Sequence, residues 1–93
     1  MADPLFKVGV LGATGFIGSP YRAEIRECKE AEIVALCARR QDLLAKAVRE
    51  DQAQVATQDW REVVEHPDVK LVVVGTPDGL HHEEVVACAA QGK

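Results

Sequence analysis

The sequence has few aromatic residues (4%), no block of lysines or arginines, and no apolar run near the roughly 20 residues of a membrane-spanning helix. A formal net charge of −4 without a basic stripe makes nucleic acid a poor partner. The first residues contain no apolar segment of the secretory type. We therefore expect a cytoplasmic protein that binds neither membranes nor nucleic acid.

Cysteines are few and widely separated: Cys28, Cys37 and Cys88 form no Cys-x-x-Cys pair. An odd number without paired spacing predicts neither a disulfide framework nor a structural zinc site. We expect three small buried apolar residues in a reducing compartment. The adjacent His81 and His82 also lack the usual spacing of metal ligands on a helix, so no metal site is expected.

What is present is the composition of a globular domain, 47% hydrophobic and 28% charged, in a chain of 93 residues. This length allows one domain with one modest core. Short apolar runs with strand character alternate with stretches of helical periodicity. We expect strands at residues 6–11, 32–37, 53–57 and 69–75.

Each expected strand is followed by a helix with an apolar face. The side chains expected to face the core are Ile17, Tyr21, Ile25 and Cys28 in the first helix, Leu43, Leu44, Ala47 and Val48 in the second, Trp60, Val63 and Val64 in the third, and Val85, Val86, Ala89 and Ala90 in the last. Asp42 and Asp59 are expected to cap the second and third helices, and Gly92 to end the last one.

Strands that alternate with helices predict an α/β fold of the Rossmann type, with a parallel sheet and helices on both faces. In this arrangement the strands lie in the order 3-2-1-4, and ligands bind where the order reverses, between the first and fourth strands. The bends that follow these two strands then lie at the same edge of the sheet. The chain ends before the remaining strands of such a sheet.

A glycine-rich segment at residues 12–18 (Gly-Ala-Thr-Gly-Phe-Ile-Gly) joins the first strand to the first helix. We expect Gly12 to allow the tight turn, Gly15 to let backbone N–H groups approach a pyrophosphate, and Gly18 to let the helix pack closely on the sheet. The helix N-terminus adds unpaired N–H donors and the positive end of a dipole. The context predicts a dinucleotide-binding loop.

The end of the second expected strand indicates which dinucleotide binds. An NAD site commonly has a carboxylate about 20 positions beyond the glycines, where it binds the adenine ribose hydroxyls. Ala38, Arg39 and Arg40 stand there instead. Two guanidinium groups suit a ribose 2′-phosphate, which favours NADP over NAD. The alternative interpretation makes both arginines solvated loop charges.

A third segment, Thr76-Pro77-Asp78-Gly79 followed by Leu80 and His81, forms an expected turn after the fourth strand. We expect the Thr76 hydroxyl and free backbone groups of this turn to hold the ribose on the nicotinamide side. A polar position on the last helix is the plainer interpretation of His82.

The stretch 7–93 resembles the N-terminal cofactor domain of the Gfo/Idh/MocA oxidoreductases, which include glucose-fructose oxidoreductase and inositol 2-dehydrogenase. The resemblance is carried by Thr76-Pro77, by His81 five positions after the threonine, and by the helix end Ala89-Ala90-Gln91-Gly92-Lys93. The glycine spacing, Gly-x-x-Gly-x-x-Gly, departs from the more usual Gly-x-Gly-x-x-Gly of that family.

The resemblance implies a role for each segment along the cofactor. The implied contacts are Gly12, Ala13, Thr14, Gly15, Phe16 and Ile17 at the pyrophosphate, Ala38, Arg39 and Arg40 at the adenine ribose, and Thr76, Pro77, Asp78 and His81 along the remainder. Family members continue with a fifth strand, a Glu-Lys-Pro motif whose lysine contributes to catalysis, and a larger substrate domain. We therefore expect residues 1–93 to be an incomplete N-terminal domain that contains no catalytic residue.

The implied function is NAD(P)-dependent hydride transfer to or from a sugar, a cyclitol or a related hydroxyl or carbonyl substrate, performed by the full-length protein as a homo-oligomer. The chain alone is expected to be inactive. The alternative is a non-catalytic dinucleotide sensor or regulatory scaffold, since this family also contains regulators. A purely structural module without a ligand is the third interpretation.

Overall fold

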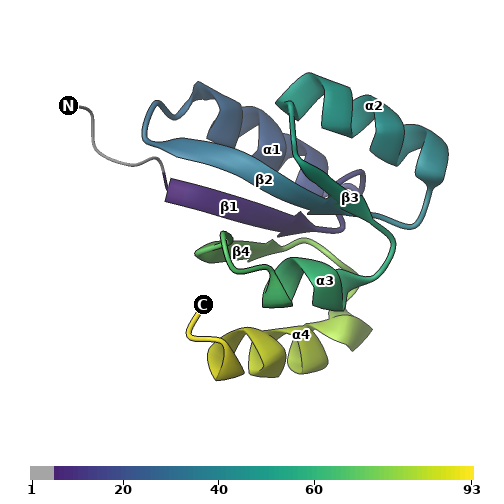
Figure 1. The fold of residues 1–93 in the computed structure, drawn as a ribbon. Coiled ribbons are helices and arrows are strands. Elements are labelled where there is room, and N and C mark those ends of the chain that lie inside the picture. The colour runs from purple at the N-terminus through teal and green to yellow at the C-terminus, as the bar shows by residue number, and fades with distance from the viewer. Residues whose placement is uncertain (1–5) are drawn as a thin grey trace.

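A four-stranded parallel sheet organises the protein, as the sequence predicts (Figure 1). The computed structural model describes residues 6–93, except the side chain of Asp78. The expectation that the first residues contain no secretory segment therefore falls largely outside the described residues. The strands lie in the order β3-β2-β1-β4, which confirms the predicted order 3-2-1-4. Their bounds are β1 Phe6–Leu11, β2 Ala31–Cys37, β3 Val55–Thr57 and β4 Leu71–Val74.

Four helices cover both faces of the sheet, in pairs. Their bounds are α1 Gly18–Glu27, α2 Gln41–Asp51, α3 Trp60–Glu65 and α4 Asp78–Ala90. Figure 1 shows α1 and α2 above the sheet and α3 and α4 below it. Alternate side chains of β1 point to opposite faces, so Val10 joins the core under α2 while Leu11 joins the core over α3. Among residues 6–93, no helix is long and apolar enough to cross a bilayer.

Helix α1 buries a different face from the predicted one. Ile17 and Tyr21 are each about half exposed and Cys28 is exposed, whereas Gly18 and Arg22 are buried and Ile25 packs partly against the core. Gly18, Arg22 and Ile25 lie on one face of the helix. Because apolar residues define the expected buried face, a face that contains an arginine is not predicted. The expectations for Tyr21 and Cys28 were wrong because an ion-paired guanidinium occupies the buried side.

The buried face of helix α4 is also shifted by one position from the predicted one. Glu84 and Cys88 are buried, while Val85 and Val86 are more than half exposed and Ala89 and Ala90 are exposed too. In the described chain α4 packs on α3 and on β4, the edge strand. A helix at a sheet edge has only one narrow stripe in contact with its neighbours, which leaves the predicted apolar row uncovered.

The ends of the helices follow the sequence signals in most places. Asp59 caps α3, because its side chain accepts a hydrogen bond from the Arg61 amide at 3.0 Å. Gly92 has a φ of +74° and ends α4 as predicted, with its N–H donating to the Ala89 carbonyl. Asp42 is not the N-cap residue of α2, because the helix begins at Gln41 with Arg40 as its N-cap, and the Asp42 carboxylate binds Arg40. Leu43, expected in the core, is 38% exposed.

The edge strand β4 predicts self-association of the 93-residue chain. Leu71 is 46% exposed, and β4 pairs with β1 on one side only among the described strands. Unpaired apolar edges recruit a second strand. Sedimentation velocity should show dimers or larger species that increase with concentration, and Leu71→Lys should shift the chain toward monomer.

The control for this prediction is Val85→Lys, which removes an equally exposed apolar side chain from α4 rather than from the strand edge. It should leave the association unchanged. A chain that sediments as a monomer at every concentration would contradict the prediction.

Candidate functional site

Two bends distant in sequence meet at the carboxyl edge of the sheet. Gly12, directly after β1, has a φ of +69°, a conformation that favours glycine. A Cβ atom placed on Gly12 would lie 2.6 Å from the Gly75 carbonyl oxygen and 2.9 Å from the Thr76 nitrogen. The glycine-rich bend and the Thr76 bend are therefore neighbours, as the predicted strand order requires.

Gly18 and Gly75 complete this close packing. A Cβ on Gly18 would collide with the Gly12 carbonyl oxygen, so the absence of a side chain at Gly18 allows α1 to approach the end of β1 closely. Gly75 would carry its Cβ 3.0 Å from the Leu11 carbonyl oxygen and 3.1 Å from the Gly18 nitrogen. Sequence reasoning missed Gly75, although a glycine directly after a buried strand was an available signal.

The loop between β1 and α1 offers backbone donors. The N–H groups of Thr14, Phe16 and Ile17 donate no hydrogen bond to another described residue, whereas Gly15 N–H donates to the Gly12 carbonyl at 3.0 Å. Phe16 is 96% exposed, so its side chain leaves the loop open. Unpaired N–H groups at the start of a helix can bind a phosphate oxygen.

At the end of β2 the two predicted arginines differ from one another. Ala38 is buried and its N–H donates to the Thr57 carbonyl at 3.2 Å, while Arg39 and Arg40 are exposed. Arg40 binds Asp42 through Nη2 at 2.8 Å and Nε at 3.3 Å. Arg39 forms no ion pair with any described residue. One guanidinium, not two, is therefore uncommitted at this position.

The hydrogen bonds of the Thr76 segment differ from the predicted ones. The Thr76 hydroxyl donates to Oε1 of Glu84, so it is not a free donor for a ribose. His81 Nε2 lies against the Thr76 carbonyl, and because a carbonyl only accepts, this nitrogen carries the hydrogen. Pro77 is the N-terminal cap residue of α4 and Asp78 its first residue, so the expected turn is shorter; the Asp78 side chain lies outside the described part.

Glu84 is the polar residue that sequence reasoning missed at this edge. Its side chain is fully buried, and its Oε2 atom has no hydrogen-bond partner among the described residues. No pattern in the sequence indicates this burial, since Glu84 follows Glu83 and both are typical of a solvated helix face. Burying a polar group is costly unless it is hydrogen-bonded, and Thr76 provides the one hydrogen bond that the Glu84 carboxyl group makes to a described residue.

The thiols near this carboxylate are held in the neutral form. Burial, together with the negative charges of Glu84, Asp59 and Glu62, raises the pKa of the Cys37 thiol to about 11. Burial and Glu84 likewise raise the pKa of the Cys88 thiol. A neutral buried thiol is a poor nucleophile, so neither group suits covalent chemistry at neutral pH. Residues 6–93 also contain no cluster of His, Cys, Asp and Glu side chains that suits a metal ion.

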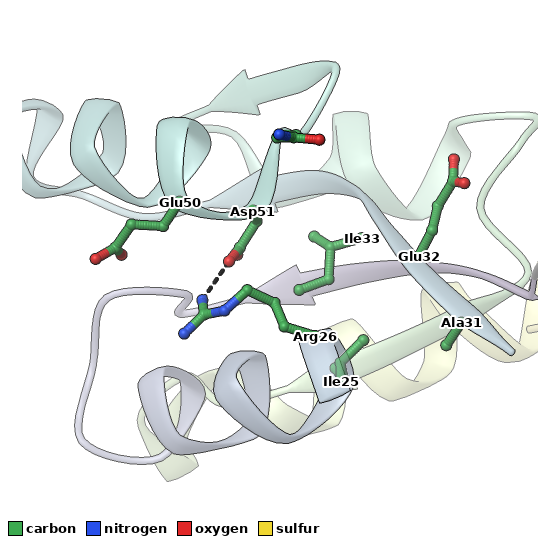
Figure 2. Close-up of a pocket in the computed structure, with 8 residues that line it drawn as sticks. Ile25, Arg26, Ala31, Glu32, Ile33, Glu50 and Asp51 are labelled. Atoms are coloured by element: carbon green, nitrogen blue, oxygen red, sulfur yellow. Dashed lines mark hydrogen bonds and ion pairs between the residues drawn. The ribbon is translucent and has the colours of Figure 1, made fainter. Parts of the chain in front are cut away.

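A second feature lies on the face of the sheet covered by α1 and α2, where a pocket of about 250 Å³ opens between the last turns of these helices and the start of β2. Figure 2 shows Arg26 directed at Asp51 on the wall of this pocket. Asp51 also binds Arg22 at 2.9 Å, and its side chain is completely buried. None of the residues that line this pocket is a predicted dinucleotide contact, although Asp51 is linked to Ala13 of the glycine-rich loop through Arg22.

Comparison with known proteins agrees with this architecture. Residues 6–93 match the family model for Gfo/Idh/MocA, described as an oxidoreductase family with an NAD-binding Rossmann fold. The scyllo-inositol 2-dehydrogenase (NADP(+)) of Bacillus subtilis is 31% identical over 88 residues, which is 94% of this chain and 24% of the relative. The levoglucosan dehydrogenase of Pseudarthrobacter phenanthrenivorans is 38% identical over 52 residues, covering 56% of this chain and 13% of the relative.

A solved structure shares the fold over nearly the whole chain. The scyllo-inositol dehydrogenase of Lactobacillus casei, solved with NAD(H) and scyllo-inositol, superposes with a TM-score of 0.88 at 23% identity. The match covers 96% of this chain and 26% of that one. The chain thus spans about a quarter, or less, of the length of these proteins.

The glycine contacts predict a steep difference between two substitutions. Gly12→Ala should lower the free energy of unfolding by about 2–4 kcal/mol, because its Cβ meets the Gly75 carbonyl and its φ is positive. Gly79→Ala in α4 has nothing within 4 Å of its new Cβ and should be neutral or stabilising by up to about 1 kcal/mol. Urea denaturation checks both. Equal stability of the two variants would show that the Gly12–Gly75 approach is looser than described.

Proposed function

Because the chain belongs to the Gfo/Idh/MocA oxidoreductase family, with its NAD-binding Rossmann fold, we propose that it supplies the dinucleotide-binding part of a sugar or cyclitol dehydrogenase. The observation that carries this proposal is the approach of Gly12 to Gly75 and Thr76 at one edge of the sheet. Relatives named as inositol and levoglucosan dehydrogenases favour a polyhydroxylated substrate. The full protein would transfer a hydride between nicotinamide and a carbon that bears a hydroxyl or carbonyl group.

The residues of this edge fit a dinucleotide. The loop at residues 12–17 would bind the pyrophosphate through the N–H groups of Thr14, Phe16 and Ile17, which donate to no other described residue. Any side chain at Gly12 would collide with the Gly75 carbonyl before it could line a ligand, so the backbone itself forms this surface. When bound, the nicotinamide supplies the hydride chemistry, and the protein contributes binding and orientation.

The Thr76 segment has a positioning role in this proposal. Its hydroxyl is held by Glu84 and its carbonyl by His81, so the start of α4 is fixed relative to β4. Pro77, Asp78 and His81 would then lie along the nicotinamide half of the dinucleotide. The fixed bend places the cofactor against the edge of the sheet without contributing a proton donor from Thr76.

The preferred cofactor follows from the arginines after β2. We propose NADP, recognised mainly by Arg39, because Arg40 is bound to Asp42 while Arg39 is exposed and has no ionic partner among the described residues. A guanidinium binds a phosphate with two parallel hydrogen bonds. The pair between Arg40 and Asp42 is exposed to water and therefore weak, so a 2′-phosphate can also compete for Arg40.

Titration of NADPH and NADH into the 93-residue chain, followed by the fluorescence of the reduced nicotinamide, tests binding and preference together. We expect tighter binding of NADPH. Arg39→Ala should weaken NADPH binding about tenfold or more and change NADH binding little, because a charged hydrogen bond contributes about 1.5–3 kcal/mol. Arg49→Ala, which removes an exposed arginine from α2, is the matched control.

Each outcome of this titration decides a separate point. Binding of both cofactors with equal affinity would contradict the preference for NADP but keep the proposed function. Binding of neither cofactor would contradict the function itself.

The proposal also predicts that residues 1–93 have no dehydrogenase activity, because relatives that turn over substrate are about four times as long or longer. Absorbance at 340 nm with inositols or sugars and either cofactor should not change. Turnover above the buffer rate would show that catalytic groups lie within these residues. We further propose a cytoplasmic location and a homo-oligomeric full-length protein, in keeping with the family.

A further inference from the structure

Arg22 is a charged residue buried where an apolar one was expected. Its side chain is 7% exposed and lies in the second turn of α1. Nη1 donates to Asp51 Oδ2 at 2.9 Å, and Nη2 lies 3.3 Å from Glu50 Oε1. Since an unpaired buried guanidinium would be strongly destabilising, these two carboxylates at the end of α2 are what allow Arg22 to be there.

The remaining donor of Arg22 reaches the glycine-rich loop. Its Nε donates to the Ala13 carbonyl at 2.9 Å, in a buried hydrogen bond. Ala13 is fully buried, and its own N–H donates to the Cys37 carbonyl at 2.9 Å. Both backbone groups of Ala13 are therefore bonded: the N–H to the end of β2, and the carbonyl to Arg22 and, at 3.4 Å, to the Ser19 hydroxyl.

This bond sets the direction of the next N–H group. The chain has no cis peptide bond among the described residues, so the Thr14 N–H points opposite to the Ala13 carbonyl and away from Arg22. That N–H is one of the loop donors that bonds to no described residue. If the peptide rotated, a carbonyl oxygen would replace the N–H and would repel an anion.

We propose that Arg22, anchored by Asp51, is the positioning residue that holds the Ala13–Thr14 peptide in the orientation that binds the diphosphate of the dinucleotide; this rests on the proposed function. Arg22 acts through geometry rather than through its charge, because Arg22 and Arg26 are balanced by Glu50 and Asp51. Through Arg22 the cluster also connects the loop to Asp51 of α2, which lies 29 residues beyond Arg22 in the chain.

The chain offers a matched control for this role. Arg26 binds the same Asp51 from the same helix but makes no described contact with the loop. Arg22→Met and Arg26→Met each remove one guanidinium from Asp51, and only the first removes the 2.9 Å hydrogen bond to the Ala13 carbonyl, leaving the longer one from Ser19 at 3.4 Å. We expect Arg22→Met to weaken binding of ADP-ribose about tenfold or more, and Arg26→Met to change it less than about twofold.

Two further measurements separate a positioning role from general damage to the fold. The amide signal of Thr14 in a ¹H–¹⁵N spectrum of the unliganded chain should shift in Arg22→Met and stay in place in Arg26→Met. Binding of adenosine, which lacks the diphosphate, should be equal in the two variants. Because Arg22→Met can also unfold the chain, Arg22→Lys is the second variant.

Arg22→Lys keeps the positive charge near Asp51, but a single ammonium group does not reproduce the fork that spans Asp51 and Ala13. We expect Arg22→Lys to have a melting temperature close to that of Arg26→Met and still to bind ADP-ribose about threefold to tenfold more weakly than Arg26→Met does. A folded Arg22 variant that binds ADP-ribose as tightly as Arg26→Met, or leaves the Thr14 signal in place, overturns the inference.

The unsubstituted chain distinguishes this failure from failure of the proposed function. If it binds ADP-ribose and the Arg22 variants bind equally well, dinucleotide binding stands and the role of Arg22 is wrong. If it binds neither ADP-ribose nor the reduced cofactors, the proposed function fails, and the inference fails with it.

Discussion

The structure depends on the close approach of β1, α1 and β4 at their shared end, where side chains are absent at three positions. Gly18 could not carry a Cβ beside the Gly12 carbonyl, nor could Gly12 beside Gly75. Protein interiors at this density do not absorb an extra methyl group without backbone movement. Because these backbones touch, the glycine-rich loop and the Thr76 bend lie side by side at the end of the sheet.

Two buried charged residues, Arg22 and Glu84, form hydrogen bonds to these two bends, and they differ in how many of their polar atoms have partners. Arg22 is bonded to Ala13, Asp51 and Glu50, so its charge is balanced and its donors are used. Glu84 bonds Thr76 through one oxygen, while the other has no partner among residues 6–93. Each residue fixes a bend through a hydrogen bond to it, so the loop geometry depends on polar contacts as well as on apolar packing.

The sequence predicted the strand order, the tight glycine bend and its meeting with Thr76, because these follow from strand and helix periodicity and from rules about parallel sheets. The predicted buried faces of α1 and α4 were wrong. The observed buried faces contain Arg22 and Glu84, whose burial depends on partners contributed by other segments, and a search for apolar residues at helical spacing passes over them. The expectation that the Thr76 hydroxyl is free was wrong for the same reason, because its partner Glu84 was not expected to be buried.

These contacts also explain why the chain is suited to holding a cofactor rather than to proton transfer. The polar groups nearest the edge already have protein partners: Thr76 is bound to Glu84, and His81 to the Thr76 carbonyl. The thiol of Cys37, whose pKa is raised to about 11, stays neutral at ordinary pH. What remains for a ligand is a set of backbone N–H groups and one uncommitted guanidinium, at Arg39. Backbone N–H groups at the start of a helix and a free guanidinium both bind phosphate oxygens, which is why we propose a dinucleotide as the ligand of this edge.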